Sequence, residues 1–196
     1  MSLNLNGPPP KKDTRMLAIG LAIAAAALLA FAAFSRTWVG RPDGIGFGPM
    51  GCTECNLTSS GSMSNAAFIE MLRGTGIDET YTSGTFAPMG WATFGLCLVA
   101  ALGLLGAAGL AIAKKRPDLP MAPTTAALLG IMIALITGCV FVATKPGGPG
   151  FVGVSMGFWA FGIGAVMGIA SAQMLAKINR PVDPDLLDGA MDPDQY

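Results

Sequence analysis

The sequence predicts an all-α membrane protein: four transmembrane helices in a bundle, cytoplasmic termini, and a small extracytoplasmic domain of short strands and one short helix. Two observations predict this class. Apolar residues make up 52% of the 196-residue chain and charged residues only 12%, roughly half the charged fraction of a soluble domain. The charges are also clustered, so four stretches of about 20 residues carry none, and that length crosses a hydrocarbon core of about 30 Å. A soluble protein would have to bury four segments with almost no polar face.

Composition also excludes several chemistries. The chain contains no His, which removes the commonest metal ligand and the usual general base near neutral pH. His-dependent zinc, c-type haem and Ser-His catalysis are therefore excluded, and we expect no metal and no cofactor. The formal net charge is zero, so nothing points to nucleic acid as a partner. No Asp, Glu, Lys or Arg lies within the four spans, which argues against a pump or a proton-coupled transporter.

The first predicted span is 16–34, preceded by a Pro-rich and basic tail at 1–15 that we expect to be disordered and cytoplasmic. A cleaved signal peptide is the alternative, but a signal core has about 7–15 apolar residues and this run is longer. The other spans are predicted at 89–113, 124–144 and 151–176, joined by a cytoplasmic loop at 114–123 and a short external turn at 145–150. The acidic tail at 177–196 is expected to be disordered.

Orientation follows from the basic residues, which resist translocation. The two tails and the 114–123 loop together hold eight Lys and Arg, whereas the other side holds four, namely Arg36, Arg41, Arg73 and Lys145. We therefore expect the loop 35–87 on the extracytoplasmic side of a plasma or inner membrane. Trp91, where the chain re-enters the membrane, fits the interfacial aromatic belt, and Trp38 is a second candidate for it.

Small residues recur along the fourth span. They are Gly153, Gly157, Ala160, Gly164, Gly168 and Ala172. In lipid, helices associate through close backbone approach, which small residues permit. We predict that these glycines mediate packing within the bundle, with oligomerisation as the alternative.

The loop 35–87 carries the remaining candidates. Residues 36–48 are rich in Gly, including Gly46, and favour short strands joined by tight turns. Ser64 is a good N-cap for a helix over 65–73, which Gly74 would end as the C′ residue. Phe68, Ile69 and Leu72 share one face of that helix, so we expect this face to lie on an apolar surface.

Cys52 and Cys55 fall on the predicted oxidising side, where a disulfide is the default state. Closing so short a loop removes little chain entropy, about 2 kcal/mol, so the bond would hold a local turn. The Cys-x-x-Cys spacing is also the redox-active arrangement, whereas a metal site lacks a second ligand pair. Cys97 and Cys139 lie inside predicted spans and are expected to be buried apolar side chains.

This layout resembles the claudin-type tetraspan family, which has a long first external loop and carries a Trp just after the first span. Trp38 matches that Trp, and residues 44–48 stand loosely in place of the family's Gly-Leu-Trp motif. Cys52 and Cys55 stand for its disulfide pair, with a shorter spacing, and residues 64–73 match its short external helix. The resemblance implies a left-handed four-helix bundle, a small extracellular sheet and a non-enzymatic role based on protein contacts.

We therefore expect a membrane protein without enzymatic activity, whose partners are the lipid bilayer and either further copies of itself or the subunits of a larger complex. Trp38, Gly46, Phe68 and Leu72 are predicted to set the architecture of the loop. The alternative function is a membrane thiol-disulfide oxidoreductase that uses the Cys52–Cys55 pair. Such an enzyme exchanges electrons with a second external Cys pair, and the turn 145–150 contains no Cys.

Overall fold

The computed structural model describes residues 12–40, 44–55, 61–76, 83–113, 121–146 and 153–178. Residues 1–11 and 179–196 of the predicted tails, most of the 114–123 loop and most of the 145–150 turn lie outside these ranges. Residues 12–15 and 177–178, predicted as parts of disordered tails, are instead helical. Among the described residues, four helices are long and apolar enough to cross a membrane, which confirms the prediction of four long apolar helices. They are α1 (Lys12–Phe34), α3 (Phe86–Ala113), α4 (Pro123–Ala143) and α5 (Met156–Ile178).

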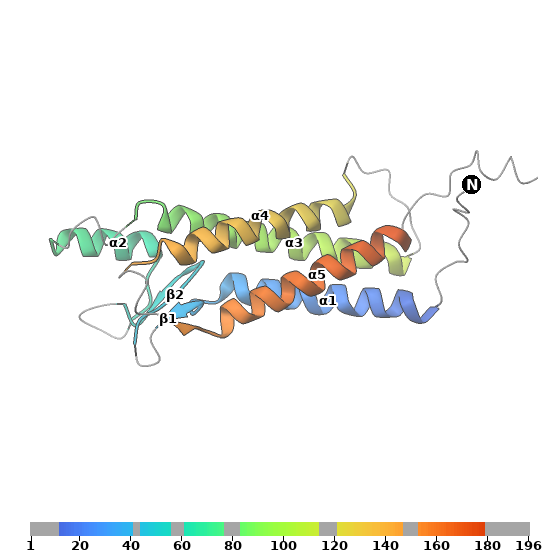
Figure 1. Cartoon of the computed structure of the whole chain (residues 1–196), viewed down its shortest axis with the longest axis horizontal. Helices are drawn as coiled ribbons and strands as arrows, with labels where there is room; N and C mark the ends of the chain where they lie inside the picture. The colour runs from blue at the N-terminus through green and yellow to red at the C-terminus, as the bar shows by residue number, and fades with distance from the viewer. Residues whose placement is uncertain are drawn as a thin grey trace, which may run out of the picture.

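The four long helices form an antiparallel bundle with a small sheet and a short helix at one end (Figure 1). The most extensive contacts join α3 to α4 and α1 to α5, and α1 also packs on α3. We call the end of the bundle that carries the sheet the sheet end. The chain reaches it four times, at the ends of α1 and α4 and at the starts of α3 and α5.

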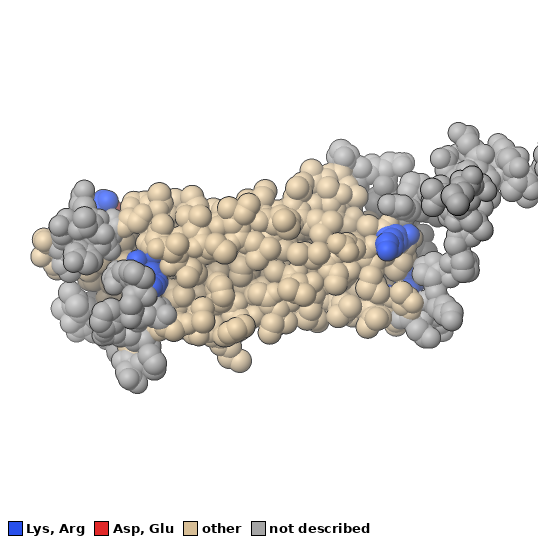
Figure 2. All heavy atoms as spheres, in the orientation of Figure 1, with Lys and Arg blue, Asp and Glu red and all other residues tan. Residues whose placement is uncertain are grey.

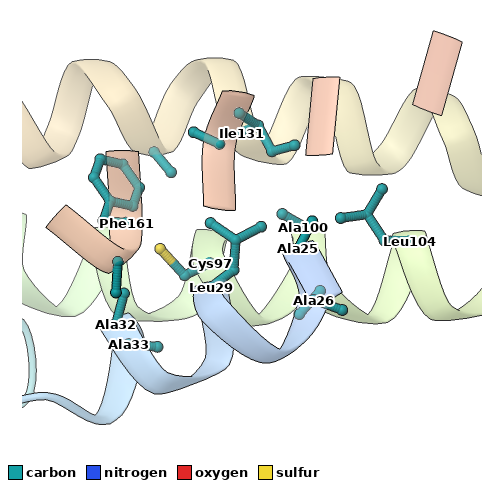
Figure 3. Packing of buried hydrophobic residues seen from close by; sticks show 14 of the residues in the cluster. Ala25, Ala26, Leu29, Ala32, Ala33, Cys97, Ala100, Leu104, Ile131 and Phe161 are labelled. Carbon is teal, nitrogen blue, oxygen red and sulfur yellow. The ribbon is translucent and has the colours of Figure 1, made fainter. Parts of the chain in front are cut away.

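Small residues let the helices approach closely (Figure 3). A Cβ added at Gly103 of α3 would lie 2.9 Å from the backbone nitrogen of Ala127 in α4. The buried side of α1 is mostly alanine, comprising Ala18, Ala22, Ala25, Ala26, Ala32 and Ala33. Because lipid chains are as apolar as leucine, close backbone packing of this kind is what holds helices together in a membrane.

Of the four glycines predicted to pack in the fourth span, three lie at close contacts and one does not. A Cβ at Gly164 would lie 3.0 Å from the Leu28 Cβ, and one at Gly168 would lie 2.7 Å from the Ile131 Cδ1. A Cβ added at Gly157 would likewise meet the segment that follows α1. Gly153 is not in the helix, because α5 begins only at Met156, and a Cβ there would meet nothing within 4 Å. Its predicted role in helix packing is therefore wrong.

The sheet has four antiparallel strands in the order β3-β2-β1-β4. The strands are β1 (Val39–Gly40), β2 (Gly46–Gly48), β3 (Gly51–Thr53) and β4 (Gly153–Val154). The first three belong to the loop between α1 and α3, as predicted. Strand β4 was not predicted: it comes from the connection between α4 and α5, and its Val154 pairs with Val39 of β1. That connection is therefore part of the sheet.

The short helix α2 (Asn65–Gly74) lies beside the sheet, at the same end of the molecule (Figure 1). Its N-cap is Ser64, whose Oγ accepts a hydrogen bond from the Ala67 backbone N–H at 3.2 Å, as predicted. Its C-terminus differs from the prediction. Gly74 is still helical, Thr75 is the C-cap, and the positive φ of 75° occurs at Gly76. We call β1–β4 and α2 together the sheet domain.

Candidate functional site

The junction between the bundle and the sheet domain is built around Trp38. This side chain is 0% exposed, although it lies only four residues after Phe34, the last residue of α1. Its indole N–H donates to the carbonyl oxygen of Ala32, in the last turn of α1, at 2.7 Å. A helix end leaves carbonyls without helical partners, so this bond satisfies both a buried donor and the helix terminus. The prediction of Trp38 as an interfacial belt residue is therefore wrong.

Three phenylalanines surround the Trp38 ring. Phe161 of α5 is stacked on it with a centroid distance of 4.7 Å. Phe141 of α4 and Phe158 of α5 meet it edge-on at 6.1 Å and 5.9 Å. Each such pair contributes about 0.5–1.5 kcal/mol beyond the area that it buries. Trp38 thus ties the end of α1 to α4 and α5.

The ring contacts continue into the sheet domain. Phe141 is stacked on Phe86 of α3 at 4.7 Å, and Phe86 meets Phe47 of β2 at 5.6 Å. Phe47 in turn meets Phe68 of α2 at 5.2 Å. We define the aromatic cluster as Trp38, Phe47, Phe68, Phe86, Phe141, Phe158 and Phe161. It is a continuous chain of ring contacts that fixes the sheet and α2 to the helix bundle.

Glycines allow the backbone to approach this cluster. A Cβ at Gly157 would lie 2.7 Å from the Trp38 Cδ1 and 2.8 Å from the Thr37 carbonyl oxygen. A Cβ at Gly48 would lie 2.7 Å from the Arg36 Cα. At Gly46 it would lie 3.0 Å from the Thr53 Oγ1, so this predicted residue is also closely packed.

Phe68 and Leu72 were predicted to face an apolar surface. Phe68 and its neighbour Ile69 are buried against the sheet, while Leu72 is half-buried at the edge of the same core. The opposite face of α2 carries Glu70 and Arg73, both exposed. The helix thus contributes its apolar face to the junction and a charged face to the surface.

Asn65 is a buried structural residue that the sequence did not predict. It is 2% exposed, and its side-chain nitrogen donates to the carbonyl oxygens of Gly48 at 2.9 Å and Pro49 at 3.4 Å. The side-chain oxygen has no hydrogen-bond partner among the described residues. Asn65 therefore joins the start of α2 to the turn between β2 and β3. An Asn after a Ser N-cap gives no sequence signal for such a contact.

Cys52 and Cys55 form a disulfide bond, as predicted. Both residues are buried, with exposed fractions of 0% and 1%. The backbone of Cys52 pairs with Met63, with N–H···O distances of 2.9 Å and 3.2 Å, so the chain before α2 covers the outer side of β3. Between the cysteines, Glu54 has a φ of 54° and an exposed side chain.

The two remaining cysteines are free and lie in different helices. Cys97 of α3 is buried, as expected. Cys139 of α4 is exposed, so its predicted burial is wrong. In a helix that crosses a membrane, an exposed side chain faces lipid or a partner helix. A thiol tolerates either environment because it behaves as a small apolar group.

Within the described residues, no group of three or more His, Cys, Asp or Glu side chains is placed to hold a metal ion. A comparison of this chain with protein-family models and with curated proteins finds no match. The function of the junction must therefore be inferred from its geometry. It holds a buried aromatic cluster, a buried disulfide and a charged outer surface on α2 and the Cys-x-x-Cys turn.

Proposed function

We propose that this protein is a non-enzymatic four-span membrane protein that acts through protein contacts made by its sheet domain. The observation that carries the proposal is the aromatic cluster, which joins the sheet domain to α1, α3, α4 and α5 through direct ring contacts. A domain held in this way presents its surface in a fixed position relative to the membrane. Preorganised surfaces bind partners at a smaller entropic cost than mobile loops.

The proposed contact surface is the charged outer face of the sheet domain. Glu70 and Arg73 are exposed on α2, and Glu54 is exposed at the tip of the disulfide-bonded turn. The proposal places this face on the extracytoplasmic side, because the larger share of basic residues flanks the opposite ends of the helices. Two partners fit: further copies of this chain, as in the claudin-type family that its layout resembles, or the subunits of a larger membrane complex.

A membrane thiol-disulfide oxidoreductase is the alternative function. The Cys-x-x-Cys disulfide favours it, because such pairs exchange with thiol proteins. The burial of both cysteines argues against it, since a thiolate must reach a disulfide sulfur to react. The structural interpretation of the bond therefore has the stronger support.

Cross-linking in native membranes followed by purification in mild detergent tests the proposal. We expect stoichiometric cross-linked species, either of this chain with itself or with other membrane proteins. The charge-reversed variant Arg73→Glu should reduce them, whereas Lys177→Glu, the same charge reversal at an exposed position in the last turn of α5, is the matched control. Thiol trapping in the same membranes tests the alternative. A trapped mixed disulfide with a thiol protein would replace our proposal with the redox function.

A further inference from the structure

The three tryptophans of the chain lie in two contrasting environments. Trp38 is fully buried, but Trp91 and Trp159 are 51% and 60% exposed. Trp91 lies in the second turn of α3 and Trp159 in the first turn of α5. Both helices start at the sheet end, so the two exposed indoles lie near the same end of the bundle, just below the sheet domain.

The exposed tryptophans belong to apolar surfaces. The Trp91 ring meets Phe94 edge-on at 5.6 Å, and Phe94 meets Phe34 of α1 at 5.3 Å, with Phe34 itself 55% exposed. Trp159 lies between Met156 and Ile163 on the exposed face of α5, which are 76% and 52% exposed. Such surfaces are unfavourable in water but suit the boundary of a membrane.

The two indole N–H groups also need acceptors. The Trp38 N–H donates to a backbone carbonyl. Among the described residues, neither Trp91 nor Trp159 has a corresponding hydrogen bond. An indole is apolar over its rings and polar at its N–H group. It therefore suits the layer where acyl chains meet hydrated ester and phosphate groups.

Along its own helix, each indole lies about one hydrocarbon thickness from a basic residue at the other end of the bundle. At 1.5 Å per residue, Trp91 lies about 33 Å from Ala113, the last residue of α3, and Trp159 lies about 27 Å from Lys177. Both values are close to the thickness of a hydrocarbon core, about 30 Å. Lys114 follows Ala113 in the sequence, and Figure 2 shows basic groups at the two ends of the bundle with an uncharged surface between them.

We propose that Trp91 and Trp159 seat the sheet end of the bundle in a lipid headgroup layer, with their N–H groups donating to lipid ester or phosphate oxygens. The inference rests on the proposed function only in that the four helices span a bilayer. It places the sheet at the membrane surface. Strand β4 ends two residues before α5, and its Val154 is 48% exposed, so the open edge of the sheet lies at headgroup level. An edge so placed is shielded from pairing with soluble chains.

Fluorescence quenching by brominated lipids tests this placement. The full chain and the variants Trp91→Phe, Trp159→Phe and the double variant are reconstituted into phosphatidylcholine vesicles. Bromine is attached either close to the headgroup or near the chain ends. We expect the headgroup-proximal bromine to quench the wild-type emission more strongly, and each single variant to lose part of that quenching. The double variant retains only Trp38, and we expect its emission to be blue-shifted and little quenched by either lipid.

Flotation of the same vesicles separates the two proposals. If the protein fails to float with the vesicles, the membrane-spanning assignment fails, and this inference fails with it. If the protein floats but the chain-end bromine quenches Trp91 and Trp159 best, the headgroup placement alone is overturned. Protein that floats and shows no quenching of these two residues would also overturn it, and would indicate that another protein copy covers them.

Discussion

The interior of the bundle and its junction with the sheet domain are packed by opposite means. Along the bundle, alanine and glycine dominate the helix contacts, as on the buried side of α1 and at the close approach of Gly103 to α4. At the junction, seven aromatic rings fill the space between helices and sheet. If the four helices span a bilayer, as we propose, the difference follows from the surroundings. Burial from lipid yields little free energy and close backbone contact is needed, whereas burial from water at the membrane surface rewards large apolar side chains.

Side-chain hydrogen bonds also differ between the bundle and the junction. Inside the bundle, the Thr93 hydroxyl donates to the Thr137 hydroxyl across α3 and α4 at 3.0 Å. At the junction, Trp38 and Asn65 donate to backbone carbonyls of other elements, and the Ser155 hydroxyl donates to the Thr37 carbonyl. Side chains therefore fix backbone segments that lack regular partners at the junction. In the helices, the backbone satisfies itself.

The largest expected effect is at the junction. Replacing Trp38 by Ala removes the centre of the aromatic cluster and the bond to Ala32, and should lower the free energy of unfolding by about 3–5 kcal/mol. Unfolding in mixed micelles, followed by circular dichroism, measures this loss. Phe31→Ala is the matched control and should change stability by less than about 0.5 kcal/mol, because the Phe31 side chain is 52% exposed on α1. Equal losses in the two variants would contradict the central role of Trp38.

The corresponding test inside the bundle enlarges a residue. Gly103→Ala should destabilise the protein by about 1–3 kcal/mol, because the new Cβ would meet backbone atoms of α4 that cannot move away separately. Gly109→Ala, six residues along the same helix, meets nothing within 4 Å and should be neutral or slightly stabilising. The same unfolding assay compares the two. If Gly103→Ala behaves like its control, close backbone contact does not hold α3 against α4.

Removing the disulfide should have an intermediate effect. The double variant Cys52→Ser, Cys55→Ser should lower stability by about 2 kcal/mol, since the closed loop is short. Limited proteolysis should then cut the sheet domain before the helices, which shows that the loss is local. Cys139→Ser is the control, because that thiol is free and exposed. An unchanged melting curve for the double variant would count against a structural bond.

The smallest expected effect concerns the Thr93–Thr137 bond. Hydrogen bonds between membrane helices average only about 0.6 kcal/mol, so Thr93→Val should cost about that much. A double-mutant cycle with Thr137→Val isolates the pair, and the coupling energy should not exceed about 1.7 kcal/mol. A coupling several times larger would mean that polar contacts contribute as much to the bundle as aromatic packing does to the junction.

The comparison also explains what could be predicted from the sequence. Hydropathy and charge clustering predicted the four long apolar helices, because a hydrocarbon core would require long uncharged helices. Local capping predicted the start of α2 at Ser64, and the Cys spacing predicted the disulfide. The junction was predicted only in part: Trp38 and Phe68 were named as architectural residues of the loop, but their ring contacts with the helices were not predicted. Trp38 has the same sequence context as an interfacial tryptophan, and only tertiary contacts decide whether it is buried.

Strand β4 was missed for a similar reason. Gly153 and Val154 are small and apolar, so they are indistinguishable from the start of a spanning helix by hydropathy. They form a strand because β1 offers them a free edge, and that edge is not visible in their own sequence. Asn65 was missed because its carbonyl partners, Gly48 and Pro49, lie 17 and 16 residues earlier in the chain.

The pairing of β4 with β1 has a consequence for biosynthesis. A ribosome releases Val39 long before Val154, and Phe158 and Phe161 follow later still. During translation the sheet therefore lacks its edge strand, and the Trp38 indole lacks two of its three ring neighbours, until α5 has been synthesised. Contacts between distant segments form late in folding. Completion of the sheet domain thus requires that all four long helices have been made, and a chain truncated before β4 would leave the β1 edge of the sheet unpaired.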